Sequence, residues 1–352
     1  MPTFKQEQLV DFGTRIFVAA GVQEPYATRV VESLALSNLL GVDSHGFVRI
    51  PQYLEAIAAG TIHPDAEAEV VRDNGITILL DGCGGFGQVI ARQAALMGIE
   101  RAKKSAVAIV SFANVMHIGR LGEYVALAAE QGLIALLIVN GARPGGLVSP
   151  FGSRERILGT NPIAFAIPAG SYPPLIADFS TAAVAEGKVR VAMFKGESIP
   201  NNWVVDRDGK PTTNPADLYD GGALLTFGDH KGFSLSLLAE VLAGILSGAD
   251  TPAFPSYTQL ENGAFLLVVD QTFFRLADEY CAAVDYLFSR IKDAKLMDGS
   301  SGVMIPGEPE VATRARRERE GILIDEKTWS DLVQTATRLG VELPVEMGTN
   351  QA

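Results

Sequence analysis

Hydrophobic side chains recur with a helical period at the start of the chain and predict helices there. Across residues 5–40 the spacing stays near 3.6 residues, and Gly21 and Pro25 divide this stretch into two helices. A polar pair at 43–44 can cap a further amphipathic segment that extends to about Ala59. The N-terminal part of the chain is therefore expected to be helical.

Farther along the chain, apolar runs of strand length alternate with amphipathic helical runs. Five segments of this kind are predicted, as strands at 76–80, 107–110 and 133–139 and as helices at 88–104 and 121–131. Gly132 ends the second helix. From 157 to 230 the chain is rich in Pro, Gly, Asn and Asp, which predicts short strands and turns.

The last third returns to longer elements. Residues 232–248 are apolar on nearly every face, which predicts a buried helix. A strand is expected at 265–269, a helix at 277–292 and a charged helical tail from 309. The result is mixed α/β, without the regular β-α-β alternation of a doubly wound sheet.

Composition and charge narrow the class of protein. The chain has 352 residues, 47% of them hydrophobic, which suits one large or two medium domains. The net charge of −12 disfavours nucleic acid and anionic membranes as partners, because phosphate binding needs clustered Lys and Arg. The one basic stretch, 314–319, is interrupted by acids and fits a solvated helix face.

Cysteine usage and hydropathy bear on the cellular compartment. Only Cys83 and Cys281 occur, so neither a disulfide scaffold nor a zinc cluster is expected, and a reducing cytoplasm fits best. The N-terminus lacks an apolar signal core, and no run of apolar residues is long enough to span a membrane.

One glycine-rich segment matches a dinucleotide-binding fingerprint. Residues 82–87 (GCGGFG) fit G-x-G-x-x-G between an expected strand and an expected helix, where bare N–H groups could hold a pyrophosphate. A plain glycine-rich turn explains the match equally well. The following strand, VAIVSF, does not end in an acid suited to a ribose.

Three polar side chains near residue 50 suggest a site for a small anion. His45, Arg49 and Tyr53 are spaced to form one stripe if this segment is helical, with Pro51 acceptable only in the first turn. Arg can grip a carboxylate with two hydrogen bonds, and His can exchange a proton near neutral pH. A capped surface helix with an incidental His is the alternative.

The other histidines are weaker candidates. His117 lies between an expected strand and helix, where catalytic loops often lie, although a hydrogen-bonded loop His is as plausible. Beside His230, Lys231 could meet phosphate or ribose, or it could be an ordinary surface Lys. His63 has no polar company and is expected to be structural, and no His or carboxylate pair has metal-ligand spacing.

Taken together, these segments resemble the malate/L-lactate dehydrogenase family, and most closely its hydroxycarboxylate dehydrogenase B branch. The matching stretches stand in family order and cover nearly the whole chain: GVDSHGFVRIPQY (41–53), DGCGGFGQ (81–88), HIGRLGEY (117–124), LGTNPIAFAIP (158–168), ADFSTAAVAEGK (177–188), PTTNPA (211–216), DHKGFSLSLLAEVLAGILSGA (229–249) and PGE (306–308).

The resemblance implies a fold that is not the Rossmann fold. A largely antiparallel sheet with helices would bind the nicotinamide cofactor in residues 121–274. A helical domain formed by both chain ends, 1–120 and 275–352, would carry substrate contacts and the contact between subunits of a homodimer. This expectation favours the plain turn over the phosphate cradle at 82–87.

The resemblance also assigns roles to residues. His45 matches the proton-donating histidine, Arg49 and Tyr53 match substrate-holding positions, and His117 matches a second catalytic histidine that acts as the base in some members. The expected cofactor-binding residues are His45, Gly119, Arg120, Leu121, Ile176, Ala177, Asp178, Phe179, Ser180, His230, Lys231, Gly307 and Glu308.

Several positions depart from the family pattern. Val115-Met116 replaces a frequent Ser-Asn, and residues 179–182 read FSTA where Met-Ala-Thr-Ser is frequent. Glu186 stands where Arg is frequent, and its carboxylate would disfavour an extra phosphate, so NAD is favoured over NADP. The loop 141–152 is of its own kind and leaves the substrate side chain open.

The implied activity is hydride transfer between NAD(P)H and C2 of a small anionic 2-oxo or 2-hydroxy acid. The same fold and carboxylate grip would also suit a reductase of cyclic imino acids, and the sequence does not separate the two. A non-catalytic binding protein is a further alternative, disfavoured by the retained His45, Arg49 and His117.

Overall fold

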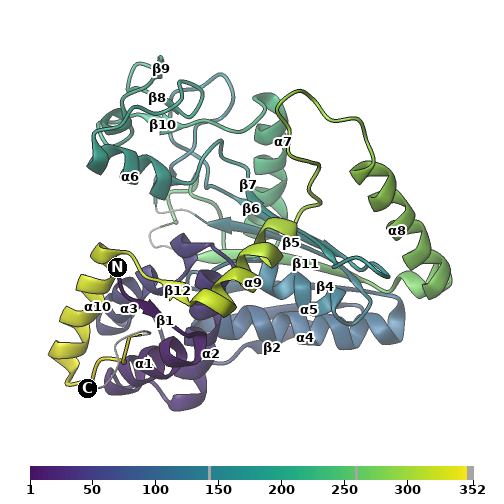
Figure 1. Cartoon of the computed structure of the whole chain (residues 1–352), viewed down its shortest axis with the longest axis horizontal. Helices are drawn as coiled ribbons and strands as arrows, with labels where there is room; N and C mark the ends of the chain where they lie inside the picture. The colour runs from purple at the N-terminus through teal and green to yellow at the C-terminus, as the bar shows by residue number, and fades with distance from the viewer. Residues whose placement is uncertain (142–143, 258–260, 347–352) are drawn as a thin grey trace.

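Both ends of the chain contribute to one helical unit. The computed structural model describes residues 1–141, 144–257 and 261–346 (Figure 1). Its N-terminal helices confirm the expected division at Gly21 and Pro25. The N-terminal elements are β1 (Thr3–Phe4), α1 (Gln6–Ala19), α2 (Glu24–Leu39) and α3 (Ile50–Ala58).

The C-terminal segment returns to this unit. The C-terminal elements are α9 (Glu308–Glu320), β12 (Ile322–Leu323) and α10 (Glu326–Leu339). β12 pairs with β1, and α10 packs against α1 and α3. Leu332 and Ala336 of α10 share a core with Phe12 and Leu34 of the N-terminal helices. The helical unit formed by both chain ends, expected from the resemblance, is confirmed.

A largely antiparallel sheet lies beside the helical unit. Its strands are β2 (Glu69–Asp73), β3 (Thr77–Gly85), β4 (Val107–Val115), β11 (Asn262–Val269), β5 (Ile134–Gly141), β6 (Pro162–Ile167) and β7 (Leu175–Ser180), in spatial order. Only β3 and β4 run parallel; every other pair in this seven-stranded sheet is antiparallel. The non-Rossmann fold is thereby confirmed.

Helices cover both faces of this sheet (Figure 1). On one face α4 (Gly87–Ser105) packs against β3, β4 and β11, and α5 (Gly122–Ala129) packs against β5, β6 and β7. The interface buries strand residues such as Val110, Leu137 and Leu266 with alanines and isoleucines of the helices. On the other face lie α7 (His230–Ala239) and the π-helical turn η4 (Glu240–Ile245).

Residues 232–248 are mostly helical as expected, but the expectation that this helix is buried is wrong. Ala239 and Ala243 pack with Ile138 and Ile163 of the sheet and are fully buried. The large residues of the helix point away from the sheet, and between 43% and 58% of each of Leu237, Val241 and Leu246 is exposed. The small residues allow the helix to approach the strands closely, and the large residues stay on the outer face. Because both kinds of residue are apolar, the sequence pattern does not indicate which face is buried.

Residues 147–158 and 182–226 add a smaller lobe beyond the edge of the main sheet, with a hydrophobic core of its own. Its strands, β8 (Val204–Val205), β9 (Pro211–Thr212) and β10 (Ala223–Leu224), are short, as the composition predicts. The helix α6 (Glu186–Lys195) was not expected there. Only Val189 and Ala192 of this helix are buried, so it carries almost no apolar period.

α8 (Ala277–Lys292) extends away from the body of the molecule (Figure 1). Phe288 is the one buried residue in this helix. Tyr286 and Leu287 are 68% and 54% exposed, and Phe274 before the helix is 78% exposed. Exposed large apolar side chains that lie close together in the chain are a feature of surfaces that contact another protein.

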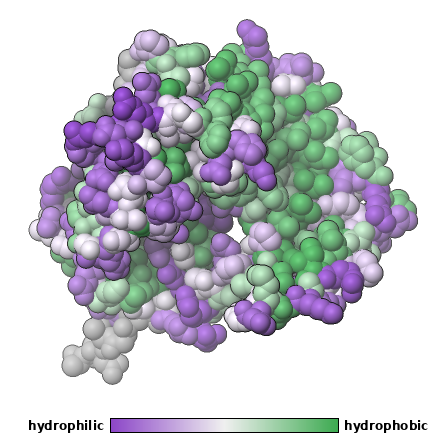
Figure 2. All heavy atoms as spheres, turned by 90° about the horizontal axis from the view of Figure 1, so that it is seen from above, coloured by the Kyte–Doolittle hydropathy of each residue, from purple (hydrophilic) through white to green (hydrophobic). Residues whose placement is uncertain are grey.

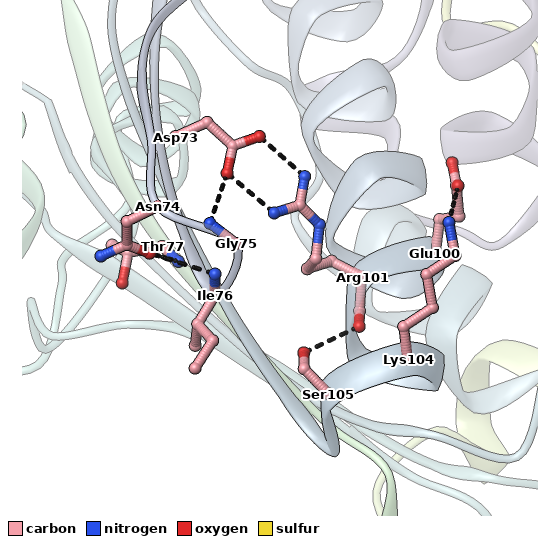
Figure 3. A network of polar contacts seen from close by, with 9 residues as sticks. All are labelled: Asp73, Asn74, Gly75, Ile76, Thr77, Glu100, Arg101, Lys104 and Ser105. Carbon is pink, nitrogen blue, oxygen red and sulfur yellow. Dashed lines mark hydrogen bonds and ion pairs between the residues drawn. The ribbon is translucent and has the colours of Figure 1, made fainter.

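A polar network fixes the turn between β2 and β3 against α4 (Figure 3). Arg101 donates two hydrogen bonds of 2.7 Å to Asp73, whose carboxylate also accepts from the N–H of Gly75. Asn74 closes the turn by accepting from the N–H groups of Ile76 and Thr77. These contacts hold β2 in place, although every residue of this strand is exposed. In the described part of the chain, no helix is long and apolar enough to cross a membrane.

Candidate active site

His45 lies in a tight turn before α3 and not on that helix. Two single 3₁₀ turns, Asp43–His45 and Phe47–Arg49, precede α3, and Gly46 interrupts them with an extended backbone. The expected stripe of His45, Arg49 and Tyr53 on one continuous helix is therefore wrong. Pro51 does lie in the first turn of α3, where its missing N–H does no harm.

Two polar residues from other elements hold this turn. Asn38 of α2 accepts from the N–H of Phe47 at 2.9 Å and donates to Asp43 at 2.7 Å. Arg317 of α9 makes two hydrogen bonds to the same Asp43, at 2.7 and 3.0 Å, and one to the carbonyl of Asn38. Arg317 thus lies in a structural network and not on the purely solvated helix face expected for 314–319.

The two histidines of interest come together from distant parts of the chain. The rings of His45 and His117 stack with centroids 5.6 Å apart. The Tyr53 hydroxyl lies 2.7 Å from Nδ1 of His117, and Nε2 of Gln88 donates to that hydroxyl at 2.7 Å. Gln88 and Tyr53 are almost fully buried. The site therefore lies where the helical unit meets the sheet.

The loop that carries His117 is fixed from several sides. The N–H of Ile118 donates to the side chain of Asn262 on β11, and its carbonyl accepts from the Tyr124 hydroxyl at 2.6 Å. Gly87 lies directly beneath the loop, and a Cβ there would be 2.5 Å from the carbonyl oxygens of Met116 and His117. The absence of a side chain at Gly87 is what allows this approach.

The glycine fingerprint at 82–87 serves packing. A Cβ at Gly82 would overlap Val115, one at Gly84 would be 2.9 Å from the His63 ring, and one at Gly85 would be 3.0 Å from the carbonyl of Gly82. Protein atoms thus fill the space that a pyrophosphate would need. Residues 82–85 of the motif form the end of β3, which belongs to the one parallel pair in the main sheet, and Gly87 starts α4, which explains why the motif imitates the Rossmann context.

Arg49 keeps donors free for a ligand. Its Nε donates to the carbonyl of Ser44 at 2.8 Å and its Nη1 to the side chain of Gln52 at 2.8 Å. A guanidinium has five N–H groups, so these two bonds orient the head and leave three N–H groups available to an anion. Arg190 and Glu186 of α6 lie close enough to affect the pKa of Arg49, which Arg190 lowers and Glu186 raises.

Both histidines are held in the neutral form. Burial, together with the positive charges of Arg49 and Arg120, lowers the pKa of His45 to about 4. Burial and the charge of Arg49 lower the pKa of His117 well below its ordinary value. Two neutral imidazoles beside a guanidinium make the site electrostatically suited to an anion, whose charge would raise both pKa values.

Arg120 and Asp178 join the loop to the last strand of the sheet. The carboxylate of Asp178 on β7 accepts from the N–H of Gly122 at the start of α5, at 2.7 Å. Arg120 is 8% exposed, and its Nε has no hydrogen-bond partner within the described ranges. A buried cation with an unused donor fits a phosphate-bearing cofactor, so these residues suit a dinucleotide.

The rest of the expected cofactor set lies on β7 and the segment beside it. Ile176 donates its N–H to the carbonyl of Pro306, so Gly307 packs directly against it. Phe179 is 37% exposed, and Ser180 donates to the carbonyl of Thr160. The remaining members of this group are half-buried Ala177 and buried Leu121.

The structure also places Glu308, His230, Lys231 and His63, which the sequence singled out. Glu308 accepts two hydrogen bonds from Lys292 and one from the N–H of Ile305, so its carboxylate is already paired. His230 and Lys231 are exposed at the start of α7, with Phe151 against the His230 ring at 6.1 Å. Nδ1 of His63 forms a hydrogen bond with the carbonyl oxygen of Cys83, in keeping with the structural role expected for this residue.

Sequence reasoning missed several residues that position this site. Gln88, Asn38 and Asn262 are buried amides, and a single amide on an apolar helix or strand gives no periodic signal. No group of three His, Cys, Asp or Glu side chains among the residues described could hold a metal ion.

Comparisons with known proteins agree with this arrangement. The sequence model of malate/L-lactate dehydrogenase matches residues 4–333. Hydroxycarboxylate dehydrogenase B of Escherichia coli O157:H7 is 34% identical over 345 residues, which cover 96% of this chain and 94% of the relative. The sulfolactate dehydrogenase structure from Methanocaldococcus jannaschii superposes with a TM-score of 0.87 at 33% identity, covering 97% of this chain and 98% of the other.

A second solved structure has a different activity in its name. Δ¹-Piperideine-2-carboxylate reductase from Pseudomonas syringae superposes with a TM-score of 0.83 at 34% identity and covers 96% of this chain and 100% of that one. The fold and the comparisons together define an oxidoreductase. The chain belongs to the malate/L-lactate dehydrogenase family.

Proposed function

We propose that this protein interconverts a 2-hydroxycarboxylate and the matching 2-oxocarboxylate with a nicotinamide cofactor. The observation that carries the proposal is the convergence of His45, His117 and a ligand-ready Arg49 in one partly buried site. The relatives named as hydroxycarboxylate, malate, lactate and sulfolactate dehydrogenases support the same class of substrate.

Arg49 would pair with the substrate carboxylate and so fix the position of C2. Tyr53 contacts His117, and the stacked imidazoles of His45 and His117 would supply the proton donor or acceptor that the C2 oxygen needs. General acid–base catalysis requires hydrogen-bond reach to that oxygen, which a histidine beside the carboxylate grip supplies.

A nicotinamide dinucleotide supplies hydride exchange at its nicotinamide ring when bound. We propose that Arg120, Gly119 and Leu121 hold it from the catalytic loop and that residues 176–180 hold it from β7. His230, Lys231, Gly307 and Glu308 complete the proposed set, with Glu308 acting through its contact with Lys292 and the backbone of Ile305.

NAD is the cofactor that we favour over NADP. The carboxylate of Glu186 accepts from the Tyr219 hydroxyl at 2.7 Å and lies 3.7 Å from Arg190, so it is held in place at the start of α6. A fixed negative charge there would repel a further phosphate group. Replacing Glu186→Arg should shift the ratio of kcat/KM values toward NADPH, measured with one substrate and both cofactors.

The proposed reaction is tested by following NADH and NADPH oxidation at about 340 nm with a panel of acids. The panel extends from pyruvate and oxaloacetate through phenylpyruvate to cyclic imines such as piperideine carboxylate. Turnover of a 2-oxo acid is the expected result. A folded protein that is silent with every member of the panel would overturn the proposal.

Reduction of a cyclic imino acid is the second candidate, and the Pseudomonas syringae relative is the specific observation in its favour. The carboxylate grip would be the same, and the electrophile would be C=N. Turnover of imines without any turnover of 2-oxo acids would replace the first proposal by this one.

A homodimer completes the proposal. The exposed apolar residues of α7, η4 and α8 form surfaces that water alone would cover in a monomer. Figure 2 shows a broad hydrophobic band on the face seen from above. Since most soluble oligomers are symmetric dimers of one chain, a second copy is the proposed partner. The free thiols of Cys83 and Cys281 favour a reducing cytoplasm as the place of action.

A further inference from the structure

A buried hydrogen-bond chain reaches His117 from α4. Nε2 of Gln88 donates to the Tyr53 hydroxyl at 2.7 Å, and the hydroxyl oxygen lies 2.7 Å from Nδ1 of His117. Gln88 is 0% exposed and Tyr53 2%, so bulk water does not compete for these bonds. The other atom of the Gln88 amide, Oε1, has no hydrogen-bond partner among the described residues.

The direction of these hydrogen bonds follows from counting the protons that each group can donate. Burial raises the pKa of Tyr53 to about 12, so its hydroxyl keeps its single proton at neutral pH. The oxygen already accepts from Gln88, so the hydroxyl proton is left for Nδ1 of His117. Nδ1 is then an acceptor, and a neutral His117 must carry its proton on Nε2.

We infer that Gln88 and Tyr53 hold His117 as the Nε2–H tautomer, which makes His117 a hydrogen-bond donor and leaves His45 to exchange the proton. This inference rests on the proposed function and deepens it. Nε2 of a neutral His117 has no lone pair to accept a proton from the substrate hydroxyl. In oxidation His45 would take that proton and the bound nicotinamide cofactor would take the hydride from C2; in reduction the cofactor would supply the hydride and the protonated His45 would return the proton to the C2 oxygen.

Gln88 is thus a positioning residue that acts through Tyr53. Its position at the start of α4 explains the neighbouring glycine, because Gly87 lets the backbone of the His117 loop lie against the same turn. Gly119 has a φ of +86°, and a Cβ there would be 3.2 Å from Nε2 of Gln88. The amide is therefore packed from the loop side as well.

The tautomer can be measured without any turnover. The chain contains four histidines, so protein labelled with ¹⁵N-histidine gives few signals, and the His117 signal is assigned by its loss in His117→Asn. Two- and three-bond ¹⁵N–¹H correlations distinguish a protonated ring nitrogen from an accepting one. We expect Nε2 protonated and Nδ1 accepting. Protonation at Nδ1, the result of a reversed chain in which Tyr53 donates to Gln88, would overturn the inference.

Variants test whether Gln88 acts through Tyr53. Gln88→Met and Tyr53→Phe should each produce a mixture of tautomers and lower kcat about 10-fold, with KM changed less than about 3-fold. The double variant should be no slower than Tyr53→Phe alone. If the losses in kcat of the two single variants multiply in the double variant, the role of Gln88 is merely structural.

A matched control is available on the same helix. Gln93 also belongs to α4, and its side chain accepts from the N–H of Ala68 at 3.0 Å, away from Tyr53. Gln93→Met should leave the His117 tautomer and kcat unchanged. Since the NMR readout needs no substrate, a wrong tautomer refutes the inference alone, whereas silence with every 2-oxo acid and imine refutes the proposed function.

Discussion

At the scale of single residues, Arg49 has the clearest consequence for activity. Its two hydrogen bonds to protein orient the guanidinium and leave donors for a carboxylate. Arg49→Ala should lower kcat/KM on the order of 10²-fold or more, since grip and orientation are lost together. Steady-state kinetics with the best 2-oxo acid measures this loss.

The matched control is Arg72→Ala, which removes an exposed arginine on β2. It should keep the activity of the unaltered enzyme. If Arg49→Ala were also indistinguishable from the unaltered enzyme, Arg49 would not be the carboxylate grip.

The two neutral histidines predict a dependence of stability on pH. The pKa of His45 falls from 6.5 to about 4 on folding, so between these values the unfolded chain binds more protons than the folded one. The free energy of unfolding should therefore be fully retained above about pH 6.5 and decline as pH falls toward 4, by up to about 1.4 kcal/mol per pH unit for each such group.

Urea unfolding of the unaltered protein, His45→Asn and the double variant with His117→Asn measures this dependence. Each substitution removes a group that resists protonation, so the decline between pH 6.5 and 4 should become shallower. An unchanged slope in the double variant would show that other groups cause the acid sensitivity.

At the scale of elements, the contact between α9 and the turn of His45 matters most. Arg317 holds both Asp43 and the carbonyl of Asn38, and only 16% of its side chain is exposed. Arg317→Ala should reduce the free energy of unfolding by ~1–3 kcal/mol and lower kcat/KM about 10-fold, because the turn loses its anchor.

Arg316 provides the comparison, since it lies one residue earlier on the same helix and is exposed. Arg316→Ala should leave stability and kinetics unchanged. Equal effects of the two substitutions, measured by urea unfolding and steady-state kinetics, would mean that α9 contributes general helix stability and not a specific anchor.

Helices and strands whose hydrophobic residues recur with one clear period were predictable from the sequence. Those without such a period were not. α1, α2, α4 and α5 each bury one face, and their positions follow from the sequence. β2 is wholly exposed and α6 buries two residues, so neither has a period to detect. The burial of 232–248 was wrongly predicted because residue size, and not polarity, decides which of its faces meets the sheet.

The site was predictable to the extent that its residues occur in unusual local sequences. His45, Arg49 and His117 stand beside glycines or in polar surroundings, and the structure brings them together. Their partners Gln88, Asn262 and Arg317 come from other elements, and nothing local marks them. Long-range hydrogen bonds fix the geometry, and such pairs leave no trace in a single sequence.

At the scale of the whole molecule, the exposed apolar surfaces predict assembly. Val241 and Leu246 are 51% and 58% exposed on η4 and just after it, and we expect a second copy to cover them. The unaltered protein should have a mass of about 75 kDa in solution, twice the 37.4 kDa of one chain. Val241→Asp together with Leu246→Asp should give the mass of a single chain, measured by light scattering.

Val71→Asp is the control for this experiment, because Val71 is 54% exposed on β2, far from α7 in the fold. The Val71→Asp variant should have the same mass in solution as the unaltered dimer. A single-chain mass for the unaltered protein would refute the homodimer. The division of the chain into 1–120 with 275–352 and 121–274 stays a prediction at this scale.

The most direct test of the whole proposal follows the hydride itself. NADH carrying deuterium at the transferable C4 position is incubated with the enzyme and the best 2-oxo acid, and the product is examined by NMR. We predict one deuterium at C2 of the resulting 2-hydroxy acid. Product without deuterium at C2, or deuterium transfer to cyclic imines only, would contradict 2-oxo acid reduction as the activity of this protein.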